Sequence, residues 1–124
     1  MKMNTLAQLV RVLLGVAGVA LVLLGIAFWT GHASSLIPVH AAIGLLFVVC
    51  LWVLSILGLK AGVNRRLVAF VFIWSLAVPI VGAIQMLLLP GAWHWVVQVT
   101  HLLTGIVAMY LGALLHKRIS LAIS

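Results

Sequence analysis

The sequence contains no aspartate or glutamate among its 124 residues. This absence excludes carboxylate general bases, carboxylate metal ligands and the acidic proton relays of many coupled transporters. The lone cysteine, Cys50, excludes an internal disulfide. The serines have no convincing base and orienting acid, and no phosphate-binding Gly-Lys-Ser motif is present. Hydrolytic and nucleophilic catalysis are therefore not indicated.

Charge is also scarce, at 6% of the residues, whereas 67% are hydrophobic. Soluble domains contain about 45–50% apolar residues, so most of this chain is expected to lie in lipid. Charge-free runs are split by turn signals at Gly31 to Pro38 and at Pro90-Gly91, and each piece reaches the ~20 residues that cross a bilayer. The sequence predicts an all-α, integral membrane four-helix bundle in a single membrane domain, residues 1–124, with spans near 9–30, 36–59, 66–89 and 94–116.

The cations predict the orientation of these spans. They lie near the N-terminus, between spans two and three, or near the C-terminus: Lys2, Arg11, Lys60, Arg65, Arg66, Lys117 and Arg118. Because cytoplasmic loops collect Lys and Arg, both termini are expected in the cytoplasm, as in a protein of the bacterial inner membrane. Topology thus accounts for the net charge of +7, and we expect no nucleic-acid partner. The apolar run after Lys2 exceeds the ~7–15 residues of a signal peptide core, so we expect it to be a retained span.

Small and polar residues form stripes on two of the spans. The last span carries such a stripe at helical spacing: His94, Gln98, His101, Gly105, Ala108 and Gly112. The first span has Gly15, Gly18 and Gly25 on one face. Such stripes let a neighbouring helix or a flat ligand approach closely, and helix packing is the commoner reason for them.

Spans two and four share a motif, which is His40-Ala-Ala-Ile-Gly44 in one and His101-Leu-Leu-Thr-Gly105 in the other. Both spans run inward from an outer loop, so residues 9–59 and 66–116 resemble a weak parallel repeat of two helices. A histidine within the membrane is costly and suggests a function. The two histidines would face each other if helix tilt absorbs an offset of roughly 3–5 Å in depth.

This topology and the paired motifs resemble the four-helix b-type cytochromes that anchor membrane dehydrogenases, hydrogenases and formate-oxidising enzymes. The resemblance implies that His40 and His101 are the axial ligands of one haem b. Glycines would line the porphyrin: Gly44 and Gly105, together with Gly18, Gly25 and Gly82. His116 has no partner for a second haem, and no Arg or Lys lies at the outer side to meet haem propionates.

Such a protein would be an electron carrier or an oxidoreductase subunit rather than a stand-alone enzyme. Its partners would be the lipid bilayer, a quinone or a larger oxidoreductase, with a homo-oligomer also open. Hydrogen bonds to the histidines' other ring nitrogens would come from Gln98, Gln85 or Thr104. His32, His94 and His116 are explained as interface residues.

Other readings remain open on sequence alone. The chain can be an accessory or assembly subunit whose histidines and glycines only pack and hydrogen-bond. A third hypothesis is that the histidines bind a group other than haem. Copper would then be bound by His40, His101 and Met86, or a quinone head would be hydrogen-bonded by one histidine.

Overall fold

The computed structural model describes all residues from 1 to 124 and contains only helices. The α-helices are α1 (Met3–Trp29), α2 (Ile37–Lys60), α3 (Arg65–Ile84) and α4 (His94–Ala122). Three short 3₁₀ segments lie in the connections: η1 (Ser34–Leu36), η2 (Gln85–Leu87) and η3 (Gly91–Trp93). All four long helices, with their adjoining 3₁₀ turns, are long and apolar enough to cross a membrane. The predicted all-α four-helix bundle is confirmed.

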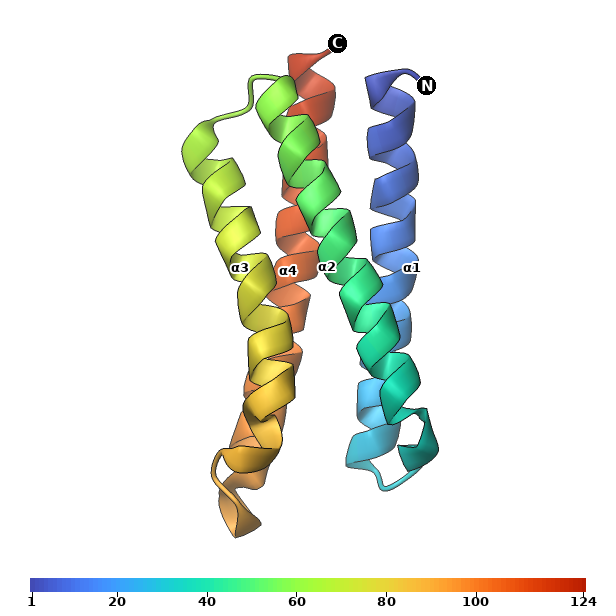
Figure 1. Cartoon of the computed structure of the whole chain (residues 1–124), viewed down its shortest axis with the longest axis vertical. Coiled ribbons are helices and arrows are strands. Elements are labelled where there is room, and N and C mark those ends of the chain that lie inside the picture. Colours follow the sequence, from blue (N-terminus) through green and yellow to red (C-terminus); the bar gives the residue numbers. More distant parts are fainter.

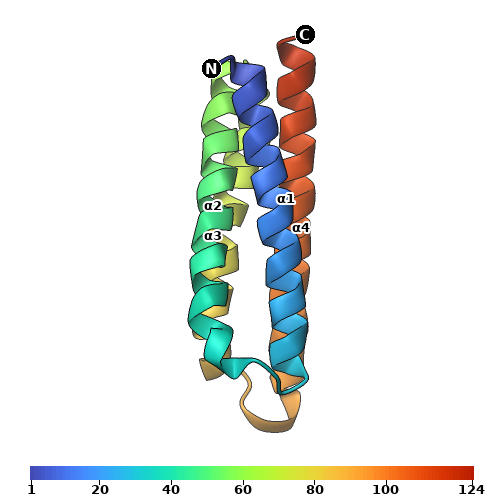
Figure 2. The same cartoon turned by 90° about the vertical axis from the view of Figure 1, so that its right-hand side faces the viewer.

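The helices run alternately up and down, so both termini lie at the same end as the connection 61–64 (Figure 1). We call this the terminal end, and the opposite end, with connections 30–36 and 85–93, the loop end. α1 and α3 each pack against both α2 and α4, while α2 and α4 also contact each other across the bundle. The side view in Figure 2 shows the same long, narrow bundle. Short connections between antiparallel helices account for this arrangement.

The helix bounds differ from the predicted spans mainly at the ends. α1 begins at Met3 and α4 continues to Ala122, because the polar residues there include no helix breaker. α3 ends at Ile84, five residues before the predicted end of its span, and η2 follows it. Hydropathy could not show this ending, because Gln85 to Leu89 remain mostly apolar while the backbone already turns.

The helix starts confirm one local expectation and correct another. Pro38 lies in the first turn of α2, where its missing N–H costs little. Serine is a common N-cap residue, and the sequence predicts Ser34 or Ser35 in that role because both precede the apolar run of α2. In the structure Leu36 occupies the N-cap position instead, and no side chain caps the helix. The serines form η1 instead, so the chain tightens into a 3₁₀ turn before α2 begins.

Close packing is confined to the half of the bundle near the terminal end. Buried residues occur in α1 only up to Gly18, in α2 only from Phe47 onward, and in α3 only up to Val78. In α4 they begin at Ala108, with Val97 as the one exception. Toward the loop end the pair α1–α2 separates from the pair α3–α4 (Figure 1). The loop-end half of the bundle therefore buries few side chains.

Gly112 offers a test of the packed half. A Cβ added there would collide with Leu14 and would lie 3.1 Å from Cδ2 of Leu51, and both leucines are fully buried. We expect Gly112→Ala to destabilise the bundle by about 1–3 kcal/mol through overpacking. Unfolding in detergent, followed by circular dichroism, measures the loss. Gly105→Ala is the control, because no atom lies within 4 Å of its added Cβ. Equal stability of both variants would contradict the packing described.

Candidate functional site

Two histidines meet in the loosely packed half of the bundle. His40 lies in the first turns of α2 and His101 lies two turns into α4, and both helices start from the loop end. Their ring centroids are 6.4 Å apart, with the ring planes inclined by 55°. The structure thus absorbs the offset in depth that the sequence implies and brings the two imidazoles together.

Each histidine ring faces a glycine of the preceding helix in its own hairpin. A Cβ added at Gly82 of α3 would lie 3.0 Å from Cε1 of His101. A Cβ added at Gly25 of α1 would lie 4.0 Å from Cε1 of His40. The two hairpins therefore repeat one arrangement, a glycine beside a histidine, which supports the parallel repeat seen in the sequence.

The other glycines of the predicted site have different surroundings. An added Cβ at Gly105, one turn beyond His101, meets nothing within 4 Å, whereas at Gly44 it meets only Leu21, at 3.9 Å. Gly18 is buried, and its added Cβ would lie 2.7 Å from Cε of Met109. Gly44 and Gly105 thus border open or loosely filled space beside the histidines, whereas Gly18 belongs to the contact between α1 and α4.

Phe28 is a neighbour of the pair that the sequence analysis missed. Its ring lies edge-on to His40, with centroids 5.4 Å apart and planes inclined by 65°. This edge-to-face arrangement is a favourable one for aromatic rings, and it fixes one side of the His40 imidazole. The signal was available in the spacing, since Phe28 follows Gly25 by three residues and so shares its helix face.

The ring nitrogens of the pair lack partners within the protein. Nδ1 of His40 and Nδ1 of His101 are both buried without a hydrogen bond, as is Nε2 of His116 at the other end of the bundle. The hydrogen bonds expected from Gln98, Gln85 and Thr104 are not formed, and the Thr104 hydroxyl donates to the carbonyl of Thr100 instead. Buried polar atoms without a partner are uncommon and call for an explanation, such as a ligand or water at the site.

The remaining histidines lie apart from the pair. His32 Nδ1 is 3.2 Å from the Thr30 hydroxyl, and His94 Nδ1 is 3.2 Å from the Leu88 carbonyl oxygen, both at the loop end. His116 lies toward the terminal end, about 22 Å along α4 from His101. They fit the predicted role of residues near the two ends of the bundle.

The structure gathers no third ligand for a simple metal ion at the pair. No group of three or more His, Cys, Asp or Glu side chains lies close enough together to hold a metal. Met86, the thioether of the copper hypothesis, lies in η2 and is 75% exposed. The pair therefore offers two nitrogen ligands and adjoining space, rather than a closed metal cage.

No family model, curated protein or solved structure matches this chain. What the site can bind is therefore judged from its own geometry.

The spacing of the pair can be compared with that of two imidazoles bound to one haem iron. An iron held by an imidazole on each side, at about 2 Å from each nitrogen, separates the two ring centroids by about 6 Å. The observed 6.4 Å agrees with this spacing. One turn from His101, a Cβ added at Gly105 would meet no atom within 4 Å. The donor set is therefore suited to low-spin haem.

Proposed function

We propose that this protein is a membrane electron carrier, similar to b-type cytochromes, that holds one haem b between α2 and α4. The observation that supports this most is the His40–His101 pair, whose ring centroids lie 6.4 Å apart in the half of the bundle that buries few side chains.

The histidines and the glycines would have different roles in holding the haem. His40 and His101 would occupy both axial positions of the iron and so leave none for O₂. Gly25 and Gly82 let the imidazoles lie close to the neighbouring helices, while Gly44 and Gly105 leave room for a flat macrocycle. The haem would supply one-electron transfer between its ferrous and ferric states.

The propionates of such a haem would meet neutral donors only. The loop end carries no Arg or Lys, so hydroxyls, indoles, imidazoles and backbone amides would take that part. Thr30, Ser34 and Trp93 are exposed there and belong to this set. A neutral surrounding of this kind stabilises the anionic propionates less than an arginine pair would.

The distribution of cations supports an orientation with the terminal end in the cytoplasm of a bacterium's inner membrane. In that orientation the histidine pair lies in the outer half of the bilayer. One haem there would exchange electrons with a donor at the outer face, a quinone in the bilayer or a larger oxidoreductase. It would not by itself carry electrons across the membrane, since His116 is the one histidine toward the terminal end and a second haem of this kind needs two.

The proposal is tested by the optical spectrum of the full chain, purified in detergent after expression with ample haem. We expect a Soret band and the sharp visible bands of low-spin b haem in the reduced-minus-oxidised spectrum. Metal analysis and quinone extraction on the same sample test the copper and quinone alternatives. A colourless protein without copper or quinone would contradict the proposal and favour an accessory or assembly subunit.

A further inference from the structure

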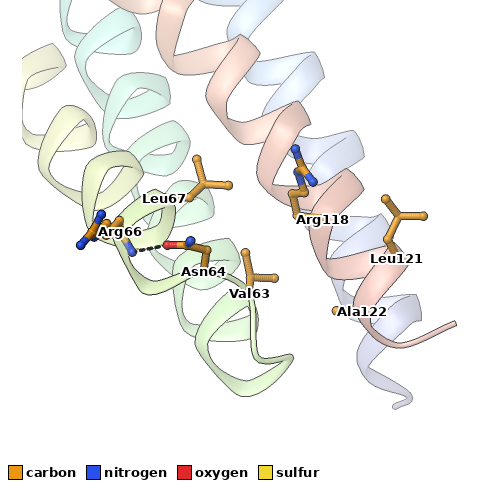
Figure 3. A pocket seen from close by; sticks show the side chains of 7 residues that line it. All are labelled: Val63, Asn64, Arg66, Leu67, Arg118, Leu121 and Ala122. Carbon is orange, nitrogen blue, oxygen red and sulfur yellow. Dashed lines mark hydrogen bonds between the residues drawn. The ribbon is translucent and has the colours of Figure 1, made fainter.

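A second recess lies at the terminal end, far from the histidine pair. It has a volume of about 570 Å³ and lies between the start of α3 and the end of α4. Seven residues line it: Val63, Asn64, Arg66, Leu67, Arg118, Leu121 and Ala122. Figure 3 shows Arg66 on α3 and Arg118 on α4, with Val63 and Leu67 between them, and the Arg66 side chain points away from α4.

These arginines have no anionic partner in the chain. The sequence has seven Lys and Arg and no Asp or Glu, so no side chain can form an ion pair with Arg66 or Arg118. Lys117 and Arg65 are next to them in sequence and add positive charge at the same end. A recess with two unpaired guanidinium groups attracts an anion from outside the protein.

The first turn of α3 adds to this preference. The N-terminus of a helix carries a partial positive charge, and α3 has no acidic residue in its first turn to offset it. Asn64 caps only one of the free amides, by accepting a hydrogen bond of 2.8 Å from the backbone N–H of Arg66. The recess therefore has an arginine on each of its two helices and the positive end of a helix beside it.

The apolar part of the recess points to the source of the anion. The recess has an apolar wall beside the arginines, formed by Val63, Leu67, Leu121 and Ala122. This wall lies at the end of two helices that are apolar enough to span a membrane. A free inorganic phosphate would gain nothing from this wall, whereas a lipid has an acyl chain and glycerol backbone to lay against it.

We propose that this recess binds the phosphate of an anionic phospholipid, with Arg118 as one guanidinium ligand and Arg66 as the other after its exposed side chain turns toward α4. Basic pockets between spanning helices on the cytoplasmic side are known to suit such headgroups. The lipid would bridge α3 and α4 at the end where no side chain of opposite charge can do so. This proposal does not depend on haem at the other end of the bundle.

The test is a lipid titration of the purified full chain in detergent, with bound lipid counted by native mass spectrometry. Dioleoyl phosphatidylglycerol is compared with zwitterionic dioleoyl phosphatidylcholine and with inorganic phosphate. Of the three, we expect tight binding of phosphatidylglycerol alone. In the double variant Arg66→Gln/Arg118→Gln, the affinity for phosphatidylglycerol should fall by a factor of about ten or more.

The matched control is Lys60→Gln/Lys117→Gln, which removes the same charge from exposed residues of the same end outside the recess. It should bind phosphatidylglycerol like the wild type, and Arg66→Lys/Arg118→Lys should recover part of the binding. Helical content of each variant is checked by circular dichroism without lipid. Equal losses in both glutamine variants would indicate general charge attraction and overturn the site. Equal binding of phosphatidylcholine, or of inorganic phosphate, would overturn the anionic lipid as its ligand.

Discussion

Replacing His101 with alanine is expected to remove the haem spectrum entirely. The variant loses one of only two nitrogen ligands at the site, and no nearby His, Cys, Asp or Glu can replace it. The loss of haem affinity should exceed the ~10–100-fold that follows when only an outer-shell partner of a metal ligand is removed. His40→Ala should have the same effect, since the two rings contribute equally to the pair. Haem content per chain, measured after purification, checks both.

His94→Ala is the matched control for these variants. It removes a histidine from the same helix, but from its first residue and from a local contact with the Leu88 carbonyl. It should keep the full haem content. If His94→Ala lost haem as His101→Ala does, or if His101→Ala kept it, the assignment of the axial ligands would be wrong.

Gly105→Leu is expected to expel the haem while leaving the helical bundle intact. An added Cβ at this position meets no atom within 4 Å, so the protein alone has room for a larger side chain. Leucine also has a better helix propensity than glycine, by roughly 0.8 kcal/mol. If a porphyrin occupies the space beside His101, the same side chain collides with it. Overpacking of this kind corresponds to about tenfold to hundredfold weaker haem binding.

Two measurements on Gly105→Leu separate these effects. Thermal unfolding of the haem-free protein should be no easier than for the wild type, while haem content should fall sharply. Gly105→Ala provides the control, because a single methyl group should leave most haem binding in place. Loss of stability without haem would show that the space is filled by protein. Unchanged haem content in the leucine variant would show that the cofactor does not lie beside Gly105.

Most of the fold could be predicted from the sequence because its signals are strong and local. Long apolar runs and turn residues such as Pro90 and Gly91 determine where the chain spans and reverses. The end of α3 at Ile84 could not be predicted in this way, because an apolar α-helix and an apolar 3₁₀ turn have the same hydropathy. Ser34 and Ser35 do not cap α2 for a similar reason: serine is a favourable cap residue, but it caps only where the backbone places it directly before the first helical turn, and here both serines lie in η1.

The candidate site was only partly visible in the sequence. The motifs at His40 and His101 suggested a pair, but its 6.4 Å spacing depends on tertiary packing that periodicity does not encode. Helical spacing placed Gly18 and Gly25 on one stripe, yet Met109 packs at the first while His40 lies near the second. A stripe identifies a contact face, whereas only the neighbouring helices decide what each position along it meets.

The uneven packing of the bundle was the feature least accessible to sequence reasoning. Both halves of each helix are rich in leucine, valine and alanine, so composition predicts a core along the whole length. The structure buries α2 only from Phe47 onward and leaves the half around His40 loosely packed. This difference arises from the separation of the two hairpins toward the loop end.

The most direct test of the central claim is the ligation state of haem in the purified wild-type protein. We expect one haem per chain. It should be low-spin in both oxidation states and should not bind carbon monoxide when reduced, because His40 and His101 fill both axial positions. A high-spin haem that binds carbon monoxide, or a protein with no haem after expression with ample supply, would contradict the claim.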